Sequence, residues 1–290
     1  MRVTARMTRF AISRRLRLNG YMAKTEKELA FLRDLYISDE WTRRFTDLVD
    51  KHFTFSKKEN FLYINAGTGS HVFAIRERMN KSAAVNATCE NEHILQIARD
   101  KAIAVRSDVD FSKIEFEDDS FDTVVADATF VRPSDLPDLI SRSERVAKSG
   151  GKIAFFLPTA GSFGEIFSLM WEVLFNADLA DHGAVVEKIV SELPTVSVAE
   201  EVAAAAGLIS VETHSSKEIF EYDNGAAFVS SPLVADFLLP VWLEGLKEKE
   251  KERVAEQLAQ LIDVEDGTLS FRFSVRALVL TGEKVDASDK

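Results

Sequence analysis

Short apolar runs alternate with amphipathic stretches along the first half of the chain. The runs that predict strands are Phe61 to Ile64, Ala83 to Thr88, Ile103 to Val105, Thr123 to Ala126 and Lys152 to Leu157. Between them, apolar residues spaced three and four positions apart predict helices at His71 to Met79, Glu92 to Ala102 and Leu136 to Ala147. This alternation is typical of a parallel sheet with helices on both faces.

Helical patterns also lie outside this alternation. Two helices are expected before the first strand, and a helix at 198–206 and strands at 209–213 and 269–280 continue the core pattern near the end of the chain. Two further apolar segments, 161–193 and 230–261, are not needed by the sheet. We expect them to be helical insertions that line an apolar substrate pocket or form a subunit interface.

A turn with two glycines, Gly67 and Gly69, follows the first predicted strand. Glycine permits a positive φ and leaves no Cβ to block a ligand that approaches the backbone. The helix that starts behind the turn would direct unpaired N–H groups and its positive dipole end at such a ligand. The turn therefore either binds a nucleotide-like cofactor or simply connects a strand to a helix, and the motif alone does not decide between them.

Composition narrows the class of protein. The 290 residues can form one large α/β domain with an insertion or two small domains, and 46% of them are hydrophobic, as in globular proteins. The net charge of −11 argues against a broad surface for nucleic acid or anionic membrane. The single cysteine, Cys89, excludes an internal disulfide and fits a cytoplasmic location. No apolar run is long enough to span a membrane.

The first residues differ from the rest of the chain. Six arginines and no acidic residue lie within the first twenty positions, so residues 1–24 predict a basic tail. An Arg-rich segment without acids is typical of an organelle-targeting peptide, and it could also bind phosphate. The alternative is an upstream start, because a more ordinary sequence begins at Met22. The polar end of the chain, 285–290, is expected to be a loose tail.

Acidic residues stand at the ends of successive predicted strands. Glu90 follows the second strand, Asp110 follows the third strand region with Phe111 beside it, and Asp127 ends the fourth. In parallel sheets ligands bind beyond the carboxyl ends of the strands. An acid about twenty residues after a glycine turn can accept hydrogen bonds from ribose hydroxyls. Together these residues predict a cofactor site.

Further motifs occur in a fixed order after the turn. They are Ile97-Ala98-Arg99-Asp100-Lys101-Ala102, Phe116-Glu117-Asp118-Asp119-Ser120-Phe121-Asp122 and Arg145-Val146-Ala147-Lys148-Ser149-Gly150-Gly151. With the glycine turn, they make the segment from about Asn60 to Thr159 resemble the class I S-adenosylmethionine-dependent methyltransferases, in particular the group that acts on small molecules. The resemblance implies a Rossmann-like α/β fold, with a mostly parallel seven-stranded sheet whose last strand is antiparallel.

The resemblance also implies an activity and a domain organisation. The expected enzyme transfers a methyl group from S-adenosyl-L-methionine to a small or medium, partly apolar acceptor; it binds no nucleic acid, and it could form a homodimer. Residues 25–284 would form one methyltransferase domain. Its expected parts are N-terminal helices at 25–58, a cofactor-binding core at 59–160 and helical insertions over the substrate at 161–196 and 222–264.

Cofactor contacts can be carried over from the family position by position. The glycine turn would hold the methionine part, Glu90 the ribose, and Asp110 with Phe111 the adenine, while Asp127 and Ala128 would flank the sulfonium. The full set of expected cofactor-binding residues is Asn65, Ala66, Gly67, Gly69, Glu90, Asn91, Asp110, Phe111, Asp127 and Ala128.

Three residues depart from the family pattern. Asn65 replaces an acid, His71 stands where a third glycine is common, and Cys89 aligns with the usual acid after the second strand, so that Glu90 must take its role. These departures motivate a second hypothesis, a methyltransferase-like fold that has lost activity and serves as a binding or assembly module. A nicotinamide dehydrogenase fits poorly, because Val72 stands where its third glycine would be needed.

Methyl transfer requires a base only if the acceptor must lose a proton. His182 and His214 are the candidates for that role, although a lone histidine is more often structural or on the surface. No cluster of histidine and cysteine predicts a metal site, and no GxSxG element predicts a hydrolase.

Overall fold

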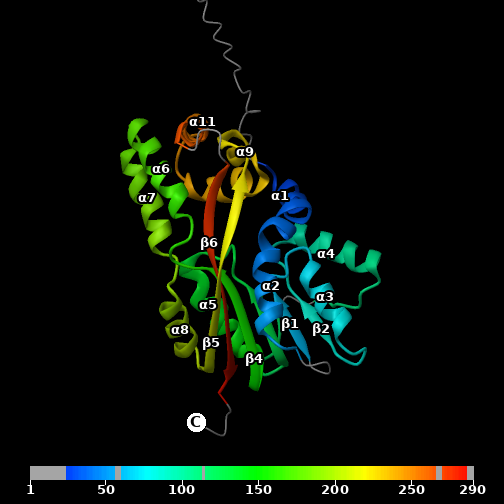
Figure 1. The fold of residues 1–290 in the computed structure, drawn as a ribbon. Coiled ribbons are helices and arrows are strands. Elements are labelled where there is room, and N and C mark those ends of the chain that lie inside the picture. Colours follow the sequence, from blue (N-terminus) through cyan, green and yellow to red (C-terminus); the bar gives the residue numbers. More distant parts are fainter. Residues whose placement is uncertain (1–23, 56–59, 113–114, 266–269, 286–290) are drawn as a thin grey trace, which may run out of the picture.

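The computed structural model describes residues 24–55, 60–112, 115–265 and 270–285, and the expectations for residues 1–23 and 286–290 lie outside this part. A six-stranded sheet in the order β2-β1-β3-β4-β6-β5 forms the centre of the described chain (Figure 1). The first four strands are parallel: β1 (Phe61–Ile64), β2 (Val85–Ala87), β3 (Phe121–Asp127) and β4 (Ala147–Pro158). β6 (Phe271–Lys284) is antiparallel to both β4 and β5 (Leu208–Tyr222), which confirms the expected orientation of the last strand.

The expectation of seven strands is not confirmed. The strand predicted at Ile103 to Val105 was wrong, because these residues form the last turn of α4 (Glu92–Val105). Ile103 and Val105 are 77% and 59% exposed, so their side chains do not have the burial that a central strand would give them. Farther along, Asp110 makes one isolated parallel bridge to Asn86. Among the described residues, a single bridge therefore stands where a strand beside β2 was expected.

Helices cover both faces of the sheet because side chains alternate along each strand. Phe61 and Tyr63 point toward a core formed with α2 (Arg43–His52), α3 (Ser70–Arg78) and α4, whereas Leu62 packs on the other face. That second core contains residues of α5 (Leu136–Val146), which follows a short 3-10 helix η2 (Pro133–Asp135), and of α8 (Val196–Ala205). The alternation is the period of two that β-structure imposes on buried residues.

The N-terminal helices form one continuous segment. α1 (Glu26–Leu32) begins with a capping box between Thr25 and Glu28, and a π-helix, η1 (Arg33–Thr42), connects it to α2. The buried residues of η1 are Arg33, Ile37 and Trp41. Their spacing of four places them along one side of the helix. Long π-helices are rare and often occur at functional sites.

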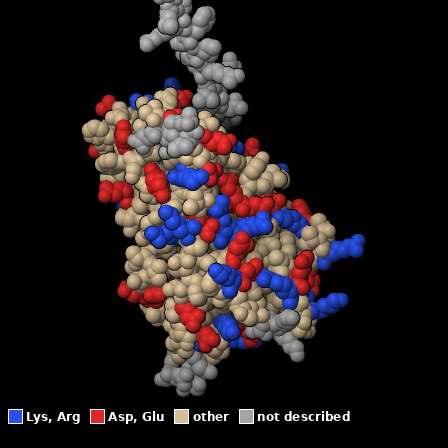
Figure 2. Space-filling view, in the orientation of Figure 1, with Lys and Arg blue, Asp and Glu red and all other residues tan. Residues whose placement is uncertain are grey.

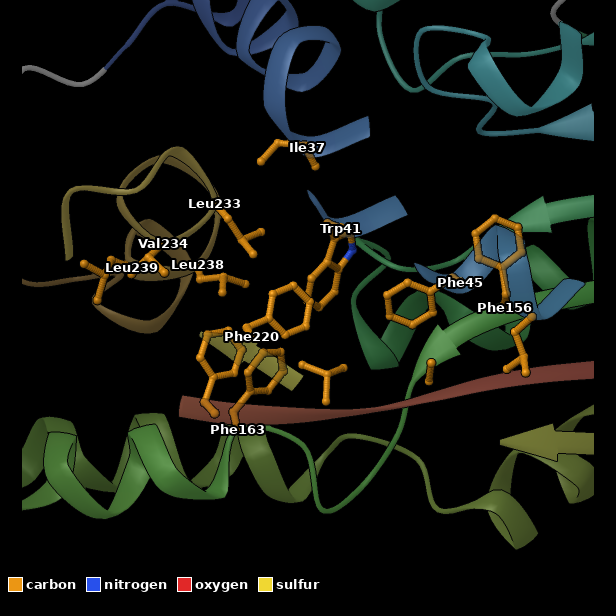
Figure 3. Packing of buried hydrophobic residues seen from close by; sticks show 14 of the residues in the cluster. Ile37, Trp41, Phe45, Phe156, Phe163, Phe220, Leu233, Val234, Leu238 and Leu239 are labelled. Atoms are coloured by element: carbon orange, nitrogen blue, oxygen red, sulfur yellow. The ribbon is translucent and has the colours of Figure 1, made fainter. Parts of the chain in front are cut away.

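The two apolar insertions form a helical region at one end of the sheet (Figure 1). They contain α6 (Gly164–Asn176), α7 (Ala180–Ser191), α9 (Gly225–Ser230), the π-helix η3 (Leu233–Leu238), α10 (Leu239–Trp242) and α11 (Glu248–Glu265). β5 and β6 continue past the end of β4 as a two-stranded ribbon, where residues 217–222 pair with residues 271–276. Aromatic rings on this ribbon and the surrounding helices pack together, as Figure 3 shows for Phe163 and Phe220.

Charged side chains of both signs are interspersed on the face of the molecule seen in Figure 2, with no wide basic area. No helix in the described ranges combines the length and apolar character that crossing a membrane requires.

Gly225 offers a test of how the insertion helices are joined. A Cβ on this residue would lie 2.1 Å from the backbone oxygen of Ala259 in α11, and the Gly225 N–H donates to Asp263 at 2.7 Å. We expect Gly225→Ala to lower the free energy of unfolding by about 1–3 kcal/mol, because backbone atoms cannot rotate away from the overlap. Urea denaturation measures this loss.

Gly164→Ala is the matched control, because nothing lies within 4 Å of its Cβ position. Equal stabilities for the two variants would contradict the close packing of α9 on α11.

Candidate cofactor and acceptor site

The glycine turn has the geometry that the sequence indicates. Asn65, Gly67 and Gly69 have φ values of 57°, 56° and 90°. A Cβ on Gly69 would lie 2.7 Å from the ring of Phe73, so this glycine is needed for packing. A Cβ on Gly67 would instead point toward the guanidinium of Arg33, 3.8 Å from its Nε atom. The side of the turn at Gly67 is therefore buried under Arg33, whereas Gly69 packs on Phe73.

Arg33 of η1 lies over the glycine turn at Gly67. Its Nη2 atom lies 2.6 Å from Oε1 of Glu90 and 3.9 Å from Oδ2 of Asp127. The guanidinium also lies over the ring of Phe130, 4.5 Å from the centroid. Glu90 follows β2 and Asp127 ends β3, so the cation joins the ends of the strands on either side of β1. Sequence reasoning did not identify Arg33, because no motif surrounds it.

Further polar contacts hold η1 on the turn. The Thr68 hydroxyl and the Lys101 ammonium both donate to Oδ1 of Asp34, each at 2.6 Å. Ser38 and Ser70 join their hydroxyl groups at 3.1 Å. The N-terminal helices therefore cover the glycine turn and fix the position of Arg33 above it.

Asp127 is the most deeply buried acid of the site, with 3% of the residue exposed. Burial raises the pKa of its carboxyl to about 6; the charge of Arg33 opposes this rise and that of Glu90 adds to it. Oδ1 accepts a hydrogen bond from the Thr129 N–H at 2.7 Å. Ala128 is buried beside it and donates its N–H to the Phe156 carbonyl.

The other expected cofactor residues of the turn and of β2 hold the local backbone in place. The Asn65 side chain donates to the Asp127 carbonyl at 3.1 Å and so ties the turn to the end of β3. The Ala66 N–H donates to the Thr88 carbonyl at 2.7 Å. The Asn91 side chain caps α4 by accepting from the Ile94 N–H.

The two residues expected at the adenine also make contacts within the protein. The Asp110 carboxylate accepts from the Ser112 N–H at 2.7 Å. The Phe111 ring is buried and lies 5.9 Å from that of Phe73, behind the second glycine of the turn.

His71 and Cys89 are the other two residues that depart from the family pattern. The His71 ring lies between the Tyr63 hydroxyl, 2.9 Å from Nδ1, and Asp50, 3.2 Å from Nε2, so it is held against α2. Burial raises the pKa of the Cys89 thiol well above its usual range, which keeps the group neutral.

A polar cleft of about 820 Å³ opens beside the ends of β1 and β2. Asn65, Cys89 and Glu90 line its strand side, and Arg142 and Arg145 of α5 line the opposite side. Its volume is within the range found for cofactor and small-molecule sites.

A second cavity, of about 300 Å³, lies between the sheet end and the insertion helices. We call it the acceptor cavity. Its wall consists mainly of apolar and aromatic side chains from η1, the segment after β3, α6, α7, η3 and α10. The rings are those of Trp41, Phe130, Phe163, Phe167, Phe237 and Trp242.

The two histidines proposed as bases are not among the residues that line either space. The Nε2 atom of His182 is 3.0 Å from the Trp242 carbonyl, so this residue joins α7 to α10. The ring of His214 stacks on that of His52, 3.9 Å between centroids, at the far edge of the sheet. Within the described ranges, no group of histidine, cysteine and acidic residues could hold a metal ion.

The comparisons agree with this architecture. Residues 62–155 match the family model of the methyltransferase domain. The structure of the YcgJ protein from Bacillus subtilis is similar, with a TM-score of 0.55, 15% identity and coverage of 84% of this chain and 100% of the other. Phosphoethanolamine N-methyltransferase 2 of Haemonchus contortus, in complex with phosphomonomethylethanolamine and S-adenosylhomocysteine, has a TM-score of 0.54 and 15% identity; the match covers 90% of this chain and 59% of that protein. A search of curated proteins found no match.

The buried carboxylate of Asp127 is expected to lower stability at neutral pH. Its folded-state pKa of about 6 is above the usual 3.8, so the folded protein loses stability as the pH rises through this interval. Each pKa unit corresponds to about 1.4 kcal/mol, and we expect Asp127→Asn to raise the free energy of unfolding at pH 7.5 by on the order of 2–3 kcal/mol. Chemical denaturation at pH 7.5 and pH 4 measures the difference.

At pH 4 most of this gain should disappear, because the wild-type carboxyl is then protonated when folded. Asp135→Asn, at an exposed position, is the control. A destabilised Asp127→Asn protein at pH 7.5 would contradict the assignment of Asp127 as a costly buried charge.

Proposed function

We propose that this chain, whose residues 62–155 match the methyltransferase domain, is a class I S-adenosylmethionine-dependent methyltransferase that methylates a small or medium, partly apolar acceptor. The observation that carries this proposal is the set of charges around Gly67. Arg33, Glu90 and Asp127 meet at the ends of three adjacent strands, next to the glycine turn that η1 covers. The acceptor cavity lies immediately beyond Asp127, at Thr129 and Phe130.

The residues around the glycine turn fit S-adenosyl-L-methionine in their chemistry. Gly67 adds no side chain between the turn and Arg33, where the methionine part would lie, and Glu90 can accept hydrogen bonds from both ribose hydroxyls. Arg33 supplies a cation for the carboxylate, and Asp127 an anion for the positively charged groups. Asn91, Asp110, Phe111 and Ala128 remain proposed contacts to the adenosine and sulfonium ends.

The bound cofactor supplies an activated methyl group on a positively charged sulfur. The chain has to position the acceptor in line with that group and exclude water. The insertion helices serve both purposes in this proposal, because they close the acceptor cavity over the sheet end. The Haemonchus contortus enzyme named above is in complex with phosphomonomethylethanolamine, a phosphorylated amine. The apolar wall of the cavity in this chain favours a different, less polar acceptor.

The alternative of an inactive binding or assembly module rests on Asn65, His71 and Cys89. The His71 ring is held against α2, and the Cys89 thiol stays neutral beside Glu90. Neither residue therefore argues that the chain has lost its cofactor site. Asn65 retains an acceptor oxygen, and the two acids at Glu90 and Asp127 supply the charge that it lacks. A homodimer and a cytoplasmic location stay predictions.

Calorimetric titration with S-adenosylhomocysteine tests the cofactor site without knowledge of the acceptor. We expect wild-type binding near about 1 μM, equivalent to about −8 kcal/mol. Gly67→Val should weaken binding at least about tenfold, because a side chain at this positive φ strains the turn and is directed at Arg33.

Gly150→Val is the matched control: this glycine also has a positive φ, of 70°, but nothing lies within 4 Å of its Cβ position. Absence of wild-type binding at millimolar ligand would support the binding module and contradict the methyltransferase.

Glu90 provides a second test of the same site. Glu90→Gln should weaken S-adenosylhomocysteine binding about 10- to 100-fold, since hydrogen bonds to a charged acceptor contribute roughly 1.5–3 kcal/mol. Glu92→Gln is the control, because the Glu92 side chain lies two residues away and is 74% exposed. Equal affinities for the two variants, measured by the same titration, would show that Glu90 does not hold the ribose.

A further inference from the structure

The guanidinium of Arg33 fills the space over the glycine turn. Its Nε and Nη2 atoms lie 3.8 and 3.9 Å from the position that a Cβ on Gly67 would take, and its carbon lies 4.5 Å from the centroid of the Phe130 ring. A Cβ on Gly67, only one bond from the backbone, would already touch the cation, so no ligand atom fits between the two. A ligand part that packs against this side of Gly67 therefore has to displace the guanidinium.

Glu90 is the partner that a displaced guanidinium would lose. Nη2 lies 2.6 Å from Oε1 of Glu90, and among the described residues this is the one hydrogen bond that the guanidinium makes. Oδ2 of Asp127 is 3.9 Å away, which is beyond hydrogen-bond distance. Only 8% of the Arg33 side chain is exposed, so water does not replace a lost partner. Because a buried cation without its partner is strongly unfavourable, a ligand that displaces the guanidinium must bring an anion.

The helix that carries Arg33 is tied to the turn by contacts of its own. Asp34, the next residue, accepts a hydrogen bond from the Thr68 hydroxyl and another from the Lys101 ammonium, each at 2.6 Å. These contacts do not involve the guanidinium, so they can persist while it turns about its own side-chain bonds. The cation therefore stays near the turn, where a new partner has to reach it.

The Glu90 carboxylate is shared by Arg33 and the polar cleft beside the ends of β1 and β2. A ribose in that cleft could reach it, and ribose hydroxyls are donors that a carboxylate accepts. The methionine part would carry its own carboxylate toward Gly67, and an arginine pairs with a carboxylate through two parallel hydrogen bonds. One ligand can thus take Glu90 from the guanidinium and give the guanidinium a new anion.

Building on the proposed function, we propose that Arg33 exchanges partners when the cofactor binds: it gives up Glu90 to the ribose and pairs with the carboxylate of the methionine part. Arg33 is then a specificity-determining residue. An adenosyl ligand with a carboxylate replaces the ion pair that it breaks, whereas a ligand without one leaves the cation unpaired. The site therefore selects for the amino-acid end of the cofactor as well as for its nucleoside.

Calorimetric titration of the full chain tests the exchange with two ligands that differ by one carboxylate. They are S-adenosylhomocysteine and its decarboxylated analogue, S-adenosyl-3-thiopropylamine. We expect the wild-type chain to bind the first at least about 100-fold more tightly, because only this ligand replaces Glu90 as the partner of Arg33. In Arg33→Met the preference should fall to about tenfold or less. The analogue itself should bind this variant at least about fivefold more tightly than wild type, because no cation is left unpaired.

The gain in affinity for the analogue separates the exchange from simpler roles of Arg33. A cation that only adds a contact to the carboxylate would lower the affinity for S-adenosylhomocysteine when removed and leave that for the analogue unchanged. A cation that only supports the fold would change both affinities by the same factor. Either result would overturn the proposal, and so would equal wild-type affinities for the two ligands.

Arg44→Met is the matched control. Arg44 also lies over an aromatic ring, 4.2 Å from the centroid of Phe220, and pairs with Glu218 at 3.4 Å, but it does not line the cleft. This variant should keep the wild-type affinities for both ligands. If Arg33→Met fails to fold, judged by circular dichroism, Arg33→Gln removes the charge while it keeps N–H donors. It must then show the same loss of preference and the same direction of change for the analogue.

The same titrations separate failure of the exchange from failure of the proposed function. Binding of S-adenosylhomocysteine without these changes would reject only the role of Arg33 and keep the cofactor site. No binding of either ligand to the wild-type chain at millimolar concentration would reject the cofactor site, and the exchange with it.

Discussion

The ion pair between Arg33 and Glu90, with Asp127 next to it, is the interaction on which the arrangement of the site depends. The cation is almost fully buried, and Asp127 even more so. Buried charges are tolerated only when they are paired, and removal of one partner leaves the other without compensation. The buried Arg33 cation of η1 therefore requires acids beside it, and the ends of β2 and β3 supply them. The position of the N-terminal helices over the sheet follows from this requirement.

The same helix connects the two spaces of the site. Arg33 and Trp41 lie on the buried side of η1, the first above the glycine turn and the second on the wall of the acceptor cavity. On the sheet side, Asp127 lies beside Arg33, and Thr129, two residues later, lies on the wall of the acceptor cavity. The ribbon of β5 and β6 then supports the insertion helices that close the cavity. Cofactor and acceptor would meet between η1 and the end of β3.

Sequence patterns predicted the parts of this fold that depend on neighbouring residues. The glycine turn and the helix after it are confirmed, because local periodicity and backbone freedom determine them, and the antiparallel last strand is confirmed as the family resemblance implied. The missing strand at Ile103 was not foreseen, since a short apolar run at the end of a helix has the same pattern as a strand. Arg33 was also missed: its partner Glu90 lies 57 residues away, and no local signal encodes such a pair.

Costs to stability are concentrated where the two spaces meet. Asp127 carries a buried charge, and Trp41 and Thr129 each leave a polar group unpaired. A sequence selected for stability alone could replace all three with apolar side chains of similar size, because the neighbouring core accepts such residues readily. All three lie at one sheet end, near the glycine turn and the apolar cavity. Among them, the physical argument for a transferase rests on Asp127, a buried charge that the chain keeps beside the turn at a cost to its stability.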